Sequence, residues 1–289
     1  MQKLSIKDLT FWFNHRKTLF SYFKKYQLGR NERRRLFWNN KSKILLVSHI
    51  DTVQEPKINR ITKKRIYAAG LDDRLGCALS YRIMRLIHVD LLICDHEEFG
   101  ASTAKYHKLN NYNFIIELDR CGVDFVNYTN LANSKFVEDF SKFTGRELGF
   151  GSYSDICSMN TKIGRINVGI GYYKDHAIDS YAVKKEINQA LNDVIGFIKK
   201  YGSIKYKTGP KVSYDWQSSN GNTWQKYYGN EVVKYTNSDT VELTDEHNNH
   251  DTCDLWVCVH CNNIIEENTF YPPICCGDFM KSYDECYRR

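Results

Sequence analysis

The chain has 289 residues, of which 42% are hydrophobic and 26% charged; this is enough apolar material for a folded core and excludes a disordered or collagen-like protein. Its longest apolar runs, such as residues 44–47 and 91–94, are far shorter than the ~20 residues of a membrane span, and the first residues lack the order of a secretory signal. We therefore expect a soluble, cytoplasmic protein. The abundance of Lys, Asn, Ile and Tyr suggests an AT-rich genome, which a viral protein in the host cytoplasm would fit.

Charge is unevenly distributed along the chain. Residues 1–202 hold 33 Lys and Arg against 21 Asp and Glu, a net charge of +12, and residues 203–289 hold 8 against 13, a net charge of −5. A basic body favours an anionic partner, although a solvated surface is the commoner explanation. The acidic tail disfavours nucleic acid as a partner, because contact with phosphate requires Lys and Arg.

Predicted strands and helices alternate along the body. Residues 4–26 have the pattern of one or two amphipathic helices, and residues 29–40 predict a basic loop or hairpin with a solvated surface. Strands are then predicted over 43–48, 89–94, 113–118 and 165–169, and helices over 72–87, 134–143 and 185–200. This order predicts an α/β fold, a three-layer sandwich with a mixed, largely parallel central sheet flanked by helices.

The alternation ends near residue 202. We expect a catalytic domain over residues 1–202, a linker or β-rich elaboration over 203–250, and a small Cys-rich module over 251–289.

Histidines and carboxylates follow the predicted strands of the body. Because the carboxyl ends of strands in an open α/β sheet line one crevice, we expect these side chains to converge on one site. Crowded carboxylates repel one another unless cations lie between them. Two imidazoles with several carboxylates suit Zn²⁺, Co²⁺ or Mn²⁺, and a bridging carboxylate suits two ions ~3.5–4 Å apart. The residues are His49, Asp51, Asp72, Glu97, Glu98, Asp119 and His176.

The motifs around these residues resemble a known family. In chain order they are H-I-D at 49–51, G-L-D-D-R-L-G at 70–76, E-E-F-G at 97–100, E-L-D-R at 117–120 and G-S-Y-S-D at 151–155, followed by His176. The order resembles the dinuclear zinc exopeptidases, the superfamily of the M20, M28 and M42 aminopeptidases, dipeptidases and carboxypeptidases. H-I-D-T-V and L-D-D-R-L-G are most similar to the M20 and M42 branches. The short spacings leave no room for the inserts of those branches and indicate a minimal layout nearer M28.

The resemblance implies a metal ligand set. His49 and Asp119 would hold one zinc ion, Glu98 and His176 would hold the other, and Asp72 would bridge the two.

The resemblance also implies the remaining catalytic roles. Asp51 would orient the His49 imidazole, and Glu97 would be the general base that takes a proton from a metal-bound water. Asp73 is the alternative to Asp72 as the bridging carboxylate. The implied activity is that of a zinc-dependent metallopeptidase, an aminopeptidase or dipeptidase that cleaves amide bonds of short peptides.

A second metal site is predicted in the tail. Six of the ten cysteines lie in the last 37 positions, and a cytosolic chain is a poor place for three disulfides. We expect one structural zinc in a ribbon-like module, with Cys253 and Cys275 as competitors for the ligand positions and a set of reduced cysteines without metal as the alternative. The expected ligands are Cys258, Cys261, Cys276 and Cys286.

Other functions remain open from the sequence. The same site could cleave an N-acyl amino acid or another small amide, because the chemistry at the carbonyl carbon is identical. The chain could instead be a catalytically degenerate adaptor that acts through its Cys-rich tail. Nucleic-acid binding ranks last, no membrane partner is expected, and an oligomer or protein partner would use the C-terminal module.

Overall fold

The computed structural model describes residues 2–128 and 130–210 in full and, beyond them, the backbone of short strands. Contacts divide the chain into two units, Met1–Lys234 and Tyr235–Arg289. No helix within the described residues is long and apolar enough to cross a membrane.

Two short helices and a hairpin begin the chain. They are α1 (Ile6–Trp12), α2 (Arg16–Tyr22) and the strands β1 (Gln27–Leu28) and β2 (Arg35–Trp38), with the 3₁₀ turns η1 (Lys24–Tyr26) and η2 (Asn31–Arg33). The hairpin predicted over residues 29–40 is present, but its expected solvated surface is wrong for Arg35. That side chain is buried and donates to the carbonyl oxygens of Arg33 and Tyr106, so hydrogen bonds offset its burial.

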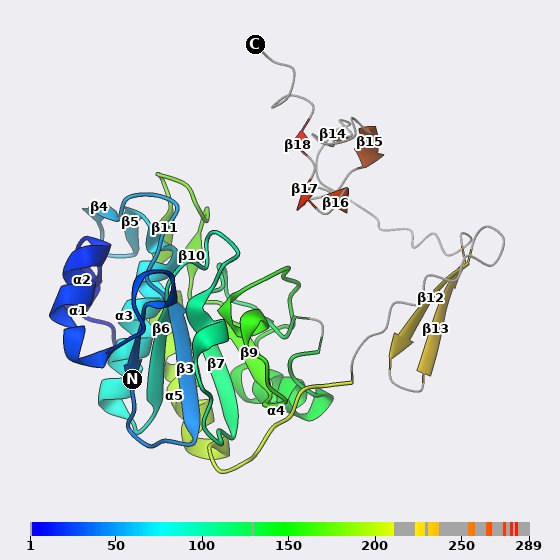
Figure 1. Ribbon diagram of the computed structural model, residues 1–289, viewed down its shortest axis with the longest axis horizontal. Helices are drawn as coiled ribbons and strands as arrows, with labels where there is room; N and C mark the ends of the chain where they lie inside the picture. The colour runs from blue at the N-terminus through cyan, green and yellow to red at the C-terminus, as the bar shows by residue number, and fades with distance from the viewer. Residues whose placement is uncertain are drawn as a thin grey trace. The chain divides into compact units, whose positions relative to one another are not determined.

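The central sheet is mixed, with its parallel strands in the middle. Its seven strands lie in the order β1-β2-β6-β3-β7-β9-β8, and Figure 1 shows the middle of this sheet. The parallel strands are β3 (Ile44–His49), β6 (Asp90–Cys94), β7 (Phe114–Leu118) and β9 (Arg165–Val168). The antiparallel strands are β1 and β2 at one edge and β8 (Phe125–Val126) at the other. The predicted α/β fold with a mixed, largely parallel sheet is confirmed.

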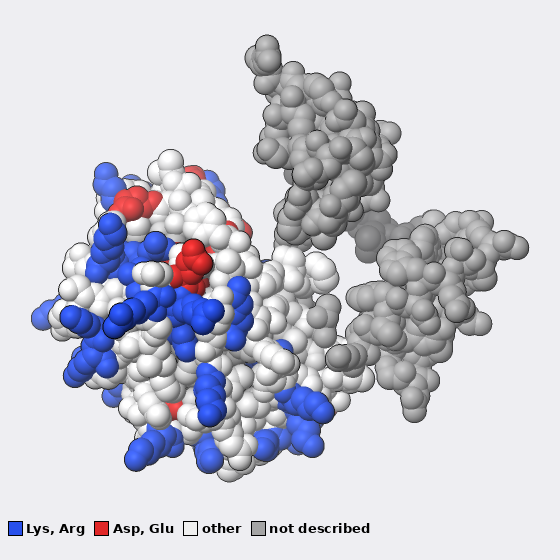
Figure 2. Space-filling model, viewed as in Figure 1, with Lys and Arg blue, Asp and Glu red and all other residues white. Residues whose placement is uncertain are grey.

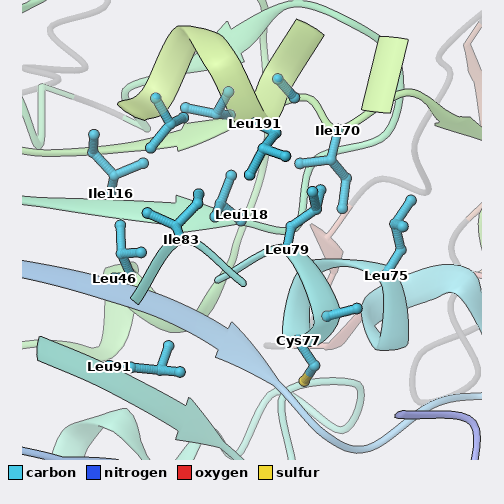
Figure 3. Packing of buried hydrophobic residues seen from close by; sticks show 14 of the residues in the cluster. Leu46, Leu75, Cys77, Leu79, Ile83, Leu91, Ile116, Leu118, Ile170 and Leu191 are labelled. Carbon is cyan, nitrogen blue, oxygen red and sulfur yellow. The ribbon is translucent and has the colours of Figure 1, made fainter. Parts of the chain in front are cut away.

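One face of the sheet packs against the helices α3 (Leu71–Leu86), α4 (Ser134–Thr144) and α5 (Lys184–Tyr201), together with α1 and α2. Figure 3 shows Leu46 and Leu91 of the strands together with Leu79 of α3 and Leu191 of α5. Each fully buried aliphatic side chain of this kind stabilises the fold by roughly 1.5–3 kcal/mol.

The opposite face of the sheet is covered differently. Alternate strand residues such as Leu45 and Leu92 point to a second cluster that includes Ala104 of η3 (Thr103–Tyr106) and Ile156 of η4 (Asp155–Ser158). The sheet therefore lies between a helical layer and a layer of 3₁₀ turns and loops.

A second, four-stranded sheet lies in the order β10-β11-β5-β4 and was not predicted from the sequence. Its antiparallel strands are β4 (Lys57–Ile61), β5 (Arg65–Ala69), β10 (Tyr172–Tyr173) and β11 (Tyr181–Val183). The chain passes from β5 directly into α3, whose first turn carries Asp72, and the loop between β10 and β11 carries His176. Pairing of β5 with β11 brings these distant segments together.

The N-terminal helices are attached to α3 through Arg74. This side chain is 1% exposed, and its Nη1 donates to the carbonyl oxygens of Trp12 at 2.8 Å and Asn14 at 3.1 Å. The segment between α1 and α2 is thus fixed to the first turn of α3.

The surface of the body is basic, as its composition predicts. Figure 2 shows Lys and Arg side chains over much of the face in view, around a small group of acidic side chains.

Beyond residue 210 the structure describes short paired strands. β12 (Thr223–Tyr228) pairs with β13 (Glu231–Thr236), β14 (Asp254–Val257) pairs with β15 (Ile264–Glu267) and β18 (Lys281–Ser282), and β16 (Ile274–Cys275) pairs with β17 (Asp278–Phe279). The predicted tail ligands Cys258, Cys261, Cys276 and Cys286 lie outside the described residues. The predicted domain limits stay a prediction.

Candidate metal centre

The strand connections define where a ligand can bind. The next strand of this sheet after β3 along the chain is β6, which lies on one side of β3. The strand after that, β7, lies on the other side of β3, and β9 lies beyond β7. In open α/β sheets a crevice forms at the carboxyl ends of strands where the connections diverge in this way. His49 is the last residue of β3 and Asp119 directly follows β7, so both side chains lie at this point.

The imidazole of His49 is surrounded by carboxylates from three other segments. Its Nε2 lies 3.3 Å from Oδ1 of Asp72, 3.3 Å from Oδ1 of Asp119 and 3.7 Å from Oε2 of Glu97. The side chain of His49 is 1% exposed, and Nε2 has no hydrogen-bond partner. A buried ring nitrogen without a partner, facing several carboxylates, is the environment expected of a metal ligand.

Asp72 lies between two imidazoles. Its Oδ1 faces His49, and its Oδ2 lies 3.4 Å from Nε2 of His176. The same nitrogen of His176 lies 3.0 Å from Oε2 of Glu98. A carboxylate with one oxygen toward each of two histidines has the arrangement that a bridging ligand requires.

Asp73 is directed elsewhere. It is fully buried, and its carboxylate accepts hydrogen bonds from the backbone N–H of His49 at 3.2 Å and of Gly76 at 2.8 Å. Asp73 therefore fixes the end of β3 to the first turn of α3, while Asp72 faces the imidazoles.

Asp51 lies behind the His49 ring. Nδ1 of His49 lies 3.0 Å from the backbone oxygen of Asp51 and 3.6 Å from its Oδ1, so the proton of a neutral ring belongs on Nδ1 and the lone pair on Nε2. The other carboxylate oxygen of Asp51 accepts from the backbone N–H of Glu98 at 3.1 Å. Asp51 thus connects His49 at the end of β3 to the segment that carries Glu98.

The carboxylates of the site resist ionisation. Burial raises the pKa of Glu97 to about 9, against the attraction of His49 and with the repulsion of Asp119. Burial also raises the pKa of Glu98 and of Asp119. Positive ions beside these groups would lower their pKa values, because an adjacent cation favours the charged form.

The imidazole of His176 differs from these carboxylates because its surroundings favour its charged form. Hydrogen bonds to Asp72 and Glu98 raise the pKa of His176 to about 11. Burial acts to raise the pKa of Asp72, but the adjacent imidazoles of His176 and His49 outweigh it and lower that pKa well below its ordinary value. A positive charge on His176 therefore favours the ionised form of Asp72.

The donor set fits divalent metal ions. Ligand atoms of His49, Asp72 and Glu98 lie within 4.8 Å of one another, as do those of His49, Glu97 and Asp119. Oε1 of Glu98, like Nε2 of His49, is buried without a hydrogen-bond partner. Imidazole nitrogen with carboxylate oxygen suits Zn²⁺, Co²⁺ or Mn²⁺.

A buried polar network supports Asp119, and sequence reasoning assigned it no role. Oδ1 of Asn167 accepts from the backbone N–H of Asp119 at 3.2 Å and of Arg120 at 3.0 Å, and its Nδ2 donates to Oδ2 of Asp119 at 3.2 Å. Ser154 donates to Glu117 and lies 3.3 Å from Asp119. The one feature of the sequence that could have indicated this network is an Asn within the buried strand β9.

Known proteins offer a comparison at the level of fold. Neither a protein-family model nor a curated protein matches the chain. Among solved structures, aminopeptidase PepT from Bacillus cereus superposes with a TM-score of 0.52 at 12% identity, covering 68% of this chain and 99% of PepT. A tripeptidase from Staphylococcus aureus gives 0.51 at 12% identity, covering 70% and 100%. The Pyrococcus horikoshii TET1 peptidase, which can assemble into a tetrahedron or a large octahedral shell, gives 0.51 at 10% identity, covering 68% and 98%.

These similarities define the class of fold. The chain has the α/β fold of known aminopeptidases and tripeptidases.

Proposed function

We propose that the protein is a two-metal peptidase that cleaves short peptides as an aminopeptidase or dipeptidase. The observation that carries the proposal is Asp72, which has one oxygen beside His49 and the other beside His176. The peptidase fold adds support, because a site of this composition lies at the carboxyl ends of the strands in a fold shared with aminopeptidases.

The residues divide into two ligand groups. His49 and Asp119 would hold one zinc ion, Glu98 and His176 would hold the second, and Asp72 would contact both. When bound, the ions would polarise the scissile carbonyl group and lower the pKa of water.

Glu97 is the general base of this proposal. Its Oε2 lies 3.7 Å from Nε2 of His49, its side chain is 13% exposed, and it is adjacent in sequence to the ligand Glu98. The Glu97 carboxylate takes a proton from the attacking water and transfers it to the nitrogen of the leaving amine as the C–N bond breaks. Asp51 holds the His49 ring in the tautomer that leaves Nε2 free.

The tail completes the proposal. A structural zinc held by Cys258, Cys261, Cys276 and Cys286, with Cys253 or Cys275 as a substitute ligand, would fold residues 251–289 as a small module after a connecting segment over 203–250.

The direct experiment compares peptide hydrolysis by the wild type and by Glu97→Gln. Unblocked di- and tripeptides, N-acetylated peptides, C-amidated peptides and N-acyl amino acids are supplied with Zn²⁺, Co²⁺ or Mn²⁺, and released products are quantified. Glu97→Gln is expected to keep its metal content and to lose ~10²–10⁴-fold in kcat, as loss of a general base does. Glu32→Gln, an exposed change on η2, is the control.

The outcomes separate the alternatives. Cleavage of unblocked peptides supports the proposal, and the end at which a blocking group abolishes cleavage is the end that is recognised. Exclusive cleavage of acylated amino acids would contradict the peptidase activity and support an N-acyl-amino-acid hydrolase. A metal-loaded wild type that cleaves no amide would support a non-catalytic adaptor.

A further inference from the structure

Exposed apolar side chains lie in the loops that carry the candidate metal donors and in the loop before η4. Phe99 is 77% exposed, Phe150 75%, Ile178 68%, Val53 51% and Tyr153 37%. Single exposed apolar residues are normal on a protein surface, but a group of them in the loops of one site indicates an interaction surface.

Three of these residues are placed together by their neighbours in sequence. Phe99 follows Glu98, Val53 is two residues after Asp51, and Ile178 is two residues after His176. A residue one or two positions away has its Cα within ~4–7.5 Å.

The neighbouring donors themselves are in contact. Glu98 lies 3.0 Å from His176, and its backbone N–H donates to Asp51. The side-chain amide of Gln54 also donates to the carbonyl oxygen of His176, which connects the loop of Val53 to the loop of Ile178. Phe99, Val53 and Ile178 therefore lie around one part of the site.

Tyr153 and Phe150 extend this surface on the loop before η4. Tyr153 is adjacent in sequence to Ser154, which contacts the proposed ligand Asp119. The hydroxyl group of Tyr153 lies 2.6 Å from Oγ of Ser158. The loop that carries Phe150 and Tyr153 therefore borders the site beside Asp119.

We propose that Val53, Phe99, Phe150, Tyr153 and Ile178 form the binding surface for an apolar side chain of the substrate next to the scissile bond. The inference rests on the proposed function and names its substrate class, which is short peptides with Leu, Met or Phe at that position. The exposed faces of Phe99 and Phe150 lose contact with water when such a side chain covers them, whereas Gly covers nothing and Asp or Glu would lose its hydration.

The test measures kcat/KM for the wild type on X-Gly-Gly and Gly-Gly-X, with X as Leu, Phe, Gly or Glu. At the end that is cleaved, Leu and Phe are expected to exceed Gly and Glu by ~10-fold or more, the usual range for apolar pockets. Phe99→Ser and Phe150→Ser should each reduce kcat/KM for the Phe peptide by ~10-fold and change the Gly peptide by less than ~2-fold. Tyr22→Ser, at an aromatic residue of α2 that is 69% exposed, is the control and should change neither.

Binding to Glu97→Gln separates failure of this inference from failure of the proposed function. Calorimetry should show Phe-Gly-Gly or Gly-Gly-Phe binding ~10-fold more tightly than Gly-Gly-Gly, and Phe99→Ser in the same background should remove the difference. Selective binding without hydrolysis by the wild type would overturn the peptidase and retain the apolar site. Hydrolysis with equal kcat/KM for Leu, Gly and Glu peptides, or an equal loss on all peptides in Phe99→Ser, would overturn the apolar site and retain the peptidase.

Discussion

Asn167 offers a quantitative test of how the fold supports the candidate metal centre. It is fully buried on β9, and its carbonyl oxygen accepts from two backbone N–H groups, those of Asp119 and Arg120. Its amide group donates to Asp119 and to the hydroxyl oxygen of Tyr128. Asn167→Leu keeps a similar volume and removes all of these hydrogen bonds.

The expected loss follows from the groups left unpaired. A buried N–H without an acceptor costs about 1–3 kcal/mol, so the Asp119 donor alone predicts a loss of that size in the free energy of unfolding, and the part-buried N–H of Arg120 adds to it. Because Asp119 also loses its orientation, zinc affinity should fall ~10–100-fold, as when the hydrogen-bonding partner of a ligand is removed.

Urea denaturation of the metal-free protein measures the first effect, and zinc titration calorimetry measures the second. Asn160→Leu, at an exposed position before β9, is the control and should change both by little. A destabilised Asn167→Leu protein that binds zinc with wild-type affinity would refute the positioning of Asp119 by this residue. Unchanged stability would refute the hydrogen-bond argument itself.

Three further predictions concern the metal, pH and the limits of the body. Chelation should lower the Tm of the wild type, and readded Zn²⁺ should restore it, because metal ions at a free concentration of 100–1,000 times their Kd stabilise the folded state by about 3–4 kcal/mol. A His176→Ala protein whose Tm, measured by calorimetry, falls as far on chelation as that of the wild type would contradict the ligand assignment. Burial, and then the Arg35 charge, lowers the pKa of His107 to about 4 from its ordinary value of 6.5. The unfolded chain therefore takes up this proton first, so the contribution of His107 to the free energy of unfolding should fall by roughly 3 kcal/mol between pH 6.5 and pH 4. Urea titrations of the wild type and of His107→Phe should differ by about that amount over this pH range. A chain ending at residue 210 should keep about two metals by elemental analysis and the full chain about three, whereas equal contents would contradict the tail zinc site.

The long periodic elements of the fold could be predicted closely. A helix predicted over 72–87 is α3 (Leu71–Leu86), and one over 185–200 is α5 (Lys184–Tyr201), because an apolar stripe with helical spacing is a local signal. The predicted strands at 43–48 and 113–118 coincide with β3 and β7 to within one residue at each end, since buried parallel strands are continuous apolar runs.

The four-stranded sheet could not be predicted in this way. β4 is largely exposed and includes Lys57 and Arg60, and β10 has two residues, so neither has an apolar pattern of its own. β5 pairs with β11 across more than a hundred residues of chain, and local sequence carries no signal for such a pairing.

The candidate site shows the same division. Residues that follow predicted strands, such as His49 and Asp119, could be predicted to converge because the strands are parallel. The sequence motif allowed either Asp72 or Asp73 beside the imidazoles, and the direction of each side chain became visible only with the backbone of α3. Asn167 makes its contacts across neighbouring strands, so its part in the site depends on sheet order.

The attachment of Arg74 makes the start of the chain part of the site's scaffold. Arg74 is two residues beyond Asp72, and its guanidinium group depends on carbonyl oxygens of Trp12 and Asn14. Proteolytic removal of residues 1–15 would leave this buried guanidinium group without the two carbonyl oxygens that accept its hydrogen bonds. Such a clipped protein would keep every candidate metal donor and still lose the hydrogen bonds that join the first turn of α3 to the segment between α1 and α2.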